Sequence, residues 1–187
     1  MKHTLIALVV ATGLACTASV TSAADWNGVY AGGVYSSDTG HQIYESSNEY
    51  DLAGDAYGVF AGYNVQTGSL VYGGEIAYST GGAGVTEYPE YHFTQFIDLK
   101  GRVGVVFGDA LAYGVLGWSI GTWNDDDITV PTDGFNAGVG VDYMLTDSVF
   151  LGAEYLFRNQ YGTFVPYFDD AHDITLQSLQ VRVGMKF

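Results

Sequence analysis

Charged side chains occur at every second position in several otherwise apolar segments, and this spacing decides what chemistry they can do. Between positions 97 and 103, Asp98, Lys100 and Arg102 alternate with apolar residues or glycine. The same alternation places six more charges on one face of such segments: Glu75, Asp142, Glu154, Arg158, Arg182 and Lys186. These acids and bases predict a network of ion pairs, because a charge that leaves water must be paired.

The same residues admit a second interpretation, in which they line a narrow water-filled pore for small solutes. If the alternating segments close into a barrel of about eight strands, its interior is just wide enough for side chains to fill it. We therefore expect the charges to pair with one another and plug the lumen, with a porin-like channel as the alternative.

Eight segments of about ten residues carry the alternation and are expected to be β-strands. They span residues 26–35, 55–64, 70–79, 93–105, 111–122, 134–145, 149–158 and 178–187. Three connections are short turns, and four are long, at 36–54, 80–92, 123–133 and 159–177. Short turns at one end and long loops at the other are typical of outer-membrane barrels, with the termini in the periplasm. The sequence thus predicts an all-β fold, an eight-stranded antiparallel up-and-down transmembrane β-barrel.

The face opposite the charges indicates what surrounds the strands. It is rich in aliphatic and aromatic residues, and the chain is 48% hydrophobic with only 14% charged residues. Every Lys and Arg after position 25 falls on the other face. A periplasmic β-sandwich is the alternative, but its outer face would meet water and carry Lys and Glu freely. Lipid is therefore the expected solvent of the apolar face.

One segment, 111–122, fits this pattern poorly. Its first half places apolar residues on one face and its second half places them on the other. A β-bulge or a register shift near Gly117 would reconcile the two halves. Tyrosines near strand ends suit aromatic girdles at the membrane surfaces; they are Tyr35, Tyr57, Tyr63, Tyr72, Tyr78, Tyr113 and Tyr143.

The first 24 residues have the features of a secretory signal peptide. Lys2 and His3 precede an apolar run at 5–11, and small residues end at Ala23 and Ala24. Cleavage there would leave a barrel domain at residues 25–187 without a cysteine. The alternative is a lipoprotein box that ends at Cys16, the one cysteine of the chain.

The long connections carry acids, including Asp38 and Asp51, but no Lys or Arg, and the formal net charge of the chain is −15. Clustered carboxylates are hard oxygen ligands, so the run Asp125, Asp126 and Asp127 is a candidate metal site, although it lacks the spacing of an EF-hand. We expect this acidic surface to favour solubility and to repel neighbouring molecules, with binding of divalent cations or host surfaces as the alternative. Nucleic acid is not an expected partner, because a polyanionic surface repels it. The histidines show no triad spacing, so we expect no enzymatic activity and no cofactor.

Several motifs resemble those of a known family. The stretch Trp26-Asn27-Gly28-Val29-Tyr30-Ala31-Gly32-Gly33 is similar to the Trp-x-Gly-aromatic-Tyr-x-Gly-Gly opening of the small porin-like outer-membrane barrels of alphaproteobacteria, with Val29 in place of the aromatic residue. Residues 58–64, 73–75, 152–155 and 181–187 resemble later strands of that family in the same order. The resemblance covers the whole chain after the expected signal peptide.

The resemblance implies an OmpA-like eight-stranded transmembrane domain in the cell outer membrane, reached by signal-directed export. Terminal Phe187 resembles the signal read by the barrel-assembly machinery, although Met185 stands where an aromatic residue is frequent. Members of such families serve envelope integrity, surface adhesion or limited solute passage. The expected function is a non-enzymatic barrel for envelope structure or surface interaction, in contact with outer-membrane lipid and lipopolysaccharide.

Overall fold

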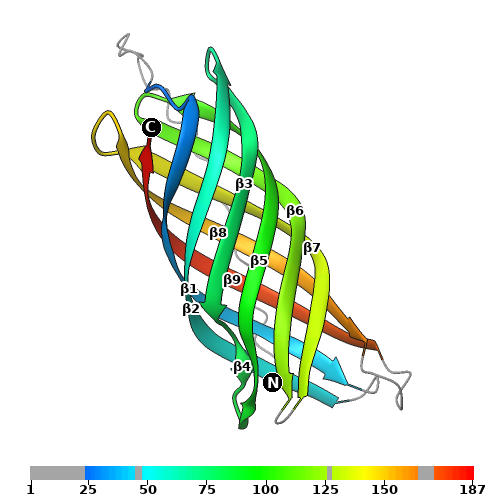
Figure 1. Ribbon diagram of the computed structural model, residues 1–187. Helices are drawn as coiled ribbons and strands as arrows, with labels where there is room; N and C mark the ends of the chain where they lie inside the picture. The colour runs from blue at the N-terminus through cyan, green and yellow to red at the C-terminus, as the bar shows by residue number, and fades with distance from the viewer. Residues whose placement is uncertain (1–23, 45–47, 126–127, 164–170) are drawn as a thin grey trace, which may run out of the picture.

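Eight long strands form a closed antiparallel barrel (Figure 1), and the predicted fold class is confirmed. The computed structural model describes residues 24–44, 48–125, 128–163 and 171–187. The long strands are β1 (Gly28–Tyr44), β2 (Asn48–Thr67), β3 (Leu70–Gly81), β5 (Tyr88–Phe107), β6 (Ala110–Asp125), β7 (Ile128–Met144), β8 (Val149–Thr163) and β9 (Ala171–Lys186). A two-residue strand, β4 (Gly84–Val85), pairs with both β2 and β5. In the described part of the chain, no helix is long and apolar enough to cross a membrane.

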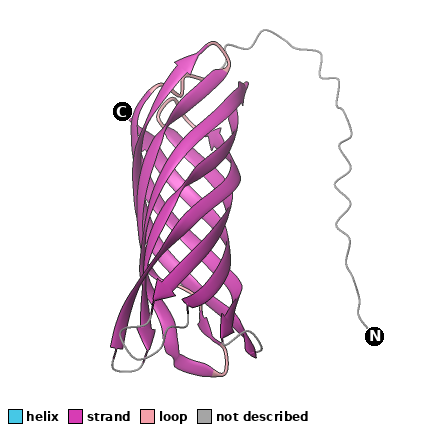
Figure 2. Ribbon diagram, turned by 90° about the vertical axis from the view of Figure 1, so that its right-hand side faces the viewer, coloured by secondary structure: helices cyan, strands magenta, loops and turns pink. Residues whose placement is uncertain are grey.

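The barrel closes because the first strand pairs on both sides. Gly33 of β1 lies opposite Val59 of β2 and opposite Val183 of β9, while every other long strand pairs with its neighbours in chain order. Figure 2 shows the strands tilted around a common axis, as closure of a sheet into a barrel requires.

The two ends of the barrel differ. At one end, which we call the turn end, short turns join β2 to β3, β5 to β6 and β7 to β8. Gly68 and Gly108 adopt φ of 63° and 60° in two of these turns, a left-handed conformation that glycine reaches without a steric cost. Both ends of the described chain lie here as well, since Ala24 N donates to Gly108 O and Phe187 N donates to Val29 O. The opposite end, which we call the far end, carries β4 and the other hairpins.

The strands are longer than the ten residues expected, and this part of the prediction was wrong. Much of the four stretches taken as long loops continues the barrel: β1 and β2 remain paired as far as Tyr44 and Asn48. In β1 the nine residues after Tyr35 extend about 30 Å along the strand, at about 3.3 Å per residue. The barrel therefore projects well past the part that alternates in the manner of a membrane strand.

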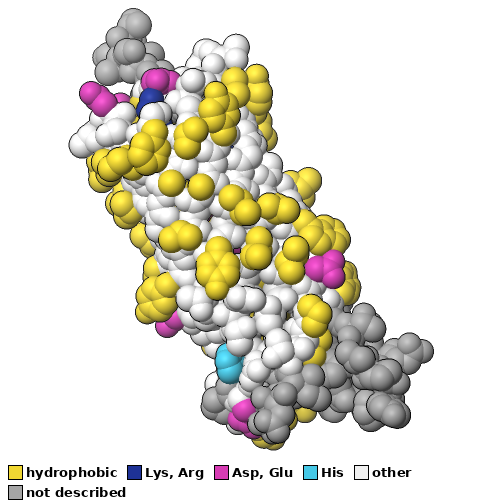
Figure 3. Space-filling view, viewed as in Figure 1, with side chains coloured by type: hydrophobic (Ala, Val, Ile, Leu, Met, Phe, Trp, Pro, Cys, Tyr) yellow, Lys and Arg dark blue, Asp and Glu magenta, His cyan; other side chains and the backbone are white. Residues whose placement is uncertain are grey.

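The outward and inward faces follow the predicted alternation within the shorter central segments. In β5, Ile97, Leu99 and Val103 are exposed, whereas Lys100 and Arg102 are buried inside the barrel. Figure 3 shows hydrophobic side chains spread over the outer surface of the strands and acidic side chains mostly towards the two ends. This apolar band matches the lipid-facing surface expected of a membrane barrel.

The predicted bulge near Gly117 is absent from β6. The pairing of β6 with β5 and with β7 runs through Gly117 without a register shift. The strand keeps its parity, with Leu111 and Tyr113 inside and Leu116 and Trp118 outside. The irregularity between β5 and β6 lies instead at Phe93 and Gln95, near the far end.

A repeated hydrogen bond marks one boundary of the apolar band. In each far-end hairpin, an outward aromatic residue donates to the side chain two positions beyond its register partner. The four pairs are Tyr35 to Asp55 (3.0 Å), Tyr78 to Gln95 (3.2 Å), Trp118 to Asp133 (3.1 Å) and Tyr155 to Gln177 (2.7 Å). We call these four pairs the belt. Aromatic rings with one polar tip suit a membrane–water boundary. Many of the outward residues beyond the belt are Ser, Thr, Asn or His, although Tyr88, Ile120 and Tyr161 are also exposed there.

Candidate functional site: the charged interior of the barrel

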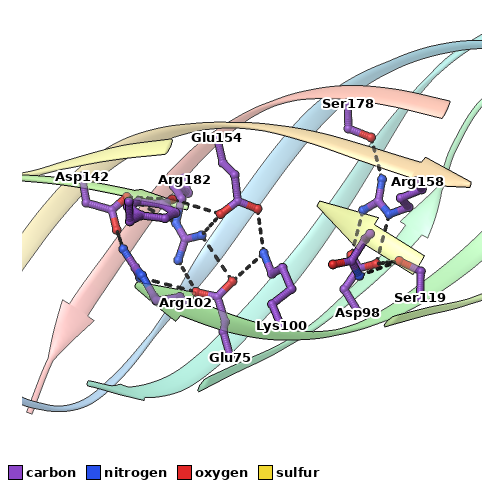
Figure 4. Close-up of polar contacts among 12 residues, drawn as sticks. Glu75, Asp98, Lys100, Arg102, Ser119, Asp142, Glu154, Arg158, Ser178 and Arg182 are labelled. Atoms are coloured by element: carbon purple, nitrogen blue, oxygen red, sulfur yellow. Dashed lines mark hydrogen bonds and ion pairs between the residues drawn. The ribbon is translucent and has the colours of Figure 1, made fainter. Parts of the chain in front are cut away.

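The lumen holds two groups of ion-paired side chains, drawn in Figure 4. The larger group brings together residues from five strands: Glu75, Lys100, Arg102, Asp142, Glu154 and Arg182. The smaller group pairs Asp98 with Arg158. Each of these side chains is at most 4% exposed. We call the eight residues the lumen network.

Arg182 is the centre of the larger group. From β9, its Nη2 lies 2.5 Å from Glu75 Oε2 on β3, and its Nη1 lies 3.0 Å from Glu154 Oε2 on β8. Its Nε lies 3.5 Å from Asp142 Oδ1 on β7. One guanidinium therefore meets three carboxylates from three strands, and its bond to Glu75 joins β9 to β3, a strand with which β9 does not pair.

Two bases on β5 complete the larger group. Lys100 Nζ lies 2.7 Å from Glu75 Oε1 and also 2.7 Å from Glu154 Oε1. Arg102 Nη2 lies 2.6 Å from Asp142 Oδ2. Charge-assisted bonds of this length are among the stronger hydrogen bonds in proteins.

The smaller group is a bidentate pair with polar support. Arg158 donates from Nε to Asp98 Oδ1 at 3.0 Å and from Nη2 to Asp98 Oδ2 at 2.7 Å. Ser119 donates to the same carboxylate, and Arg158 Nη1 donates to Ser178 Oγ at 2.6 Å. Two parallel N–H···O bonds fix the orientation of both side chains.

The two groups are each balanced in charge. Three bases face three acids in the larger group, and one base faces one acid in the smaller, so the lumen network is neutral overall. A balanced set of pairs avoids the cost of an uncompensated charge in a low-dielectric interior. Every carboxylate of the lumen network is engaged by a cation. The described residues contain no group of three or more His, Cys, Asp or Glu that could hold a metal.

Aromatic rings pack against the network. Tyr30 donates to Glu75 Oε2 at 3.0 Å, and Tyr113 donates to Glu154 Oε2 at 3.0 Å. The Arg102 guanidinium lies 3.7 Å from the centre of the Tyr113 ring, and the Arg182 guanidinium 4.0 Å from that of Phe60. Cation–π contacts of this kind are strongest when water is excluded.

Glycines on the inward faces make room for these rings. A Cβ added at Gly140 would overlap the Tyr113 ring, and one added at Gly62 would overlap Tyr30. Gly184 and Gly32 stand in the same relation to Phe150 and Phe60. A barrel of this width holds large side chains only if some of the facing positions are small, which gives the glycine richness of the chain a packing role.

Two apolar clusters close off the network along the barrel axis. The cluster at the turn end includes Trp26, Val71, Leu111, Met144 and Phe150. The cluster at the far end consists of Leu52, Ala83, Val85, Phe93, Phe96, Trp123, Val130, Ile174 and Leu176. The charges are thus enclosed between two buried apolar layers.

Some predicted site residues lie elsewhere. Lys186 was grouped with the lumen charges, but it sits at the turn end and pairs at 2.8 Å with Asp25, whose side chain is exposed. Phe187 is exposed at the same end. Asp126 and Asp127 lie outside the described residues, as does the expected signal peptide up to residue 23, and the side chain of Asp125 is not described.

Two residues were assigned to the wrong surroundings. Asp38, expected in an acidic loop, is buried on the inward face of β1, where its Oδ1 accepts no hydrogen bond from the described residues. Its carboxylate interacts electrostatically with Arg158. Tyr113, expected in an outer girdle, is a lumen residue, whereas the other six tyrosines of the predicted girdles are exposed.

The fold and its interior can now be compared with known proteins. A family model described as "Outer membrane protein beta-barrel domain" matches residues 7–187. The chain belongs to this outer-membrane β-barrel family. The apolar band of the barrel accordingly lies in the outer membrane, and the predicted resemblance to small OmpA-like barrels is confirmed.

The chain is also similar to one curated protein and to several solved structures. The chain is 28% identical over 183 residues to a 22 kDa outer membrane protein of Rhizobium leguminosarum bv. viciae, covering 91% of this chain and 82% of that one. Among solved structures, Neisserial surface protein A superposes with a TM-score of 0.56 at 16% identity, over 86% of this chain and 98% of that one. The attachment invasion locus protein Ail of Yersinia pestis gives a TM-score of 0.49 at 12% identity, over 86% and 99% of the two chains.

Family membership also orients the barrel. Outer-membrane barrels place their short turns in the periplasm and their longer connections outside the cell. The turn end is therefore assigned to the periplasm and the far end, with the belt, to the outer leaflet and the cell exterior.

Proposed function

We propose that the chain is a non-enzymatic barrel with a closed lumen that serves envelope structure or surface interaction. The observation that carries this proposal is the lumen network, in which Arg182 on β9 bonds to Glu75 on β3 and to Glu154 on β8. A hydrated ion entering this region would have to displace pairs whose side chains are at most 4% exposed. Removing one partner of a buried pair leaves an uncompensated charge, which costs several kcal/mol.

The two apolar clusters support closure independently of the charges. Phe93 packs edge-on against Trp123, with ring centres 4.8 Å apart, in the far-end cluster. Trp26 and Phe150 make a similar contact at the turn end, with ring centres 5.6 Å apart. A solute would have to pass both layers as well as the network, so the porin-like alternative has less support.

The surface role rests on the part of the barrel beyond the belt. This extension carries exposed acids such as Asp51, Glu87 and Glu90 and the exposed ring of Tyr88. Divalent cations or host surfaces are the partners proposed for it. Outer-membrane lipid and lipopolysaccharide are the partners proposed for the apolar band, and the barrel-assembly machinery for Phe187. Export by the signal peptide belongs to the same proposal.

Liposome swelling tests the closed lumen. The mature chain, refolded into vesicles and shown to be folded by heat-modifiable gel migration, should admit small sugars no faster than vesicles without protein. The matched control is a double variant, Glu75→Ala with Arg182→Ala, which removes the central pair and keeps the net charge. It shows how fast sugars enter when the lumen has been widened. Sugar uptake by the unaltered chain at the rate of a known porin would contradict the proposal.

A further inference from the structure

Among the described residues, Asp38 is the one buried carboxylate that lies outside the lumen network. It points inwards from β1 and is 2% exposed, and its Oδ1 atom is buried without a hydrogen-bond donor in the described part of the chain. No described Lys or Arg forms an ion pair with it. An ionised carboxylate that leaves water without a partner is costly, so Asp38 requires a compensating charge.

Arg158 interacts electrostatically with Asp38, but its hydrogen bonds are directed at other residues (Figure 4). Its Nε and Nη2 bond to the Asp98 carboxylate, and its Nη1 donates to Ser178 Oγ. The described interior therefore buries five acids, namely the four of the lumen network and Asp38, against four bases. The difference is one negative charge, which no described side chain neutralises.

The inner wall around Asp38 is made of small residues. In the register, Gly54 of β2 and Ser178 of β9 lie on either side of Asp38. Ser36 and Gly40 are the inward residues before and after it on β1. None of these four neighbours carries a side chain large enough to cover the carboxylate, so none of them blocks a small ion from reaching it.

Uncharged oxygen atoms lie next to the carboxylate. Ser178 Oγ accepts a hydrogen bond from Arg158 and retains a second lone pair, because a hydroxyl oxygen has two. Ser36 and Gln180 are register partners and are both buried, so they bring a second hydroxyl and an amide oxygen to the same part of the wall. Oxygen donors beside a carboxylate are the ligands that hard cations prefer. One excess negative charge matches a monovalent ion, whereas a divalent ion would leave a positive charge uncompensated.

We propose that Asp38 binds one sodium ion inside the barrel. The uncharged oxygen ligands come from three neighbours, Ser36, Ser178 and Gln180. Leu52 and Leu176, the inward residues one step further along β2 and β9, belong to the far-end cluster. The site therefore borders both this cluster and the smaller ion-paired group, so the ion is shielded from the medium and is taken up as the barrel folds.

The experiment is urea unfolding of the mature chain, refolded into phosphatidylcholine vesicles in the chloride salt of either sodium or N-methyl-D-glucamine at equal ionic strength. N-methyl-D-glucamine is a cation too large for the site. The unfolding equilibrium constant should be about tenfold lower in sodium, as for a free ion at roughly ten times its dissociation constant. Asp38→Asn keeps the shape of the side chain without its charge and should lose this sodium dependence. Asp147→Asn, the same change at an exposed acid in the β7–β8 turn, is the matched control and should keep it.

A second variant, Ser36→Ala, removes one ligand and keeps the carboxylate, so it should require a several-fold higher sodium concentration for the same effect. Equal unfolding constants of the unaltered chain in the two salts would overturn the proposal, because Asp38 would then be neutralised by a proton. A sodium dependence that survives in Asp38→Asn would also overturn it, since the ion would act at another place. Dependence on calcium instead of sodium, abolished by Asp38→Asn, would overturn the assigned ion.

Discussion

Arg182 and Glu75 face each other from strands that do not pair. Nη1 and Nη2 of the guanidinium lie 3.2 Å and 2.5 Å from the two carboxylate oxygens. In the barrel wall β9 and β3 are separated by β1 and β2, so this ion pair spans the lumen. It fixes the distance between two sides of the barrel and fills the space between them.

Loss of the Arg182–Glu75 ion pair should destabilise the barrel strongly. Replacing Arg182 by Leu leaves three carboxylates with two bases, and we expect the free energy of unfolding to fall by about 3–5 kcal/mol. The measurement is urea unfolding in lipid vesicles, followed by tryptophan fluorescence. Lys186→Leu breaks a pair whose acid, Asp25, is exposed to solvent, and should cost less than about 1 kcal/mol. Equal effects of the two substitutions would mean that the buried network contributes no more than a surface contact.

The three tryptophans should report which surface meets lipid. Trp118 is 48% exposed on the apolar band, whereas Trp26 and Trp123 are each 3% exposed inside the barrel. Phospholipids brominated on their acyl chains should therefore quench Trp118 and spare the other two. Trp118→Phe should abolish most of the quenching and Trp123→Phe should not. Quenching that survives in Trp118→Phe would place lipid against residues assigned to the interior.

The glycines under the lumen rings should tolerate no side chain. Gly140→Ala would place a methyl group against the ring of Tyr113, on which the Arg102 guanidinium packs. We expect a loss of about 1–3 kcal/mol, as for other overpacked interiors. Gly114→Ala, one strand away on the lipid face, has free space and should be close to neutral. The comparison uses the same chemical change on the two faces, and unfolding free energies that do not differ would contradict the packing role.

The pair at the turn end predicts a pH dependence. The pKa of Asp25 lies below its ordinary value of 3.8, mainly because Lys186 donates a hydrogen bond to its carboxylate. A second hydrogen bond, from the backbone N–H of Asn27, acts in the same direction. A depressed pKa in the folded state means that the pair stabilises the barrel above pH 4 and that this contribution disappears as the pH falls through the folded-state pKa. Asp25→Asn should therefore unfold slightly more easily than the unaltered chain at pH 7 and equally easily at pH 2. A difference that grows on acidification would contradict the assignment.

The parity of the membrane strands was predictable from the sequence. Once residues 97–103 are read as a strand, Lys100 and Arg102 must lie on the face opposite Leu99, because side chains alternate. The sequence also allowed the number of long strands and the location of the short turns to be predicted. Partners inside the lumen were not predictable, since Arg182 and Glu75 are 107 residues apart and parity does not say which inward residues meet.

The far-end extension was missed because its polarity is reversed. Between the belt and the turn end, most strands are apolar outside and charged or small inside. Beyond the belt the outer face meets water and the inner face packs in a cluster, so Leu52, Trp123 and Ile174 point inwards while polar residues point outwards. A search for lipid-facing alternation reads such a segment as a loop. In the first half of β6 the large apolar residues Leu111 and Tyr113 also point inwards, which gave the false signal of a bulge.

A planar-bilayer recording tests the closed lumen most directly. The refolded mature chain, confirmed as folded by heat-modifiable migration of the same sample, should give no steady single-channel steps in symmetrical salt. Variants at Glu75 or Arg102 should raise the frequency of openings if they leave the barrel folded, because they unbalance the network. Steady steps from the unaltered chain, with a conductance that changes when Glu75 or Arg102 is replaced, would contradict a closed lumen and identify the network as the lining of a pore.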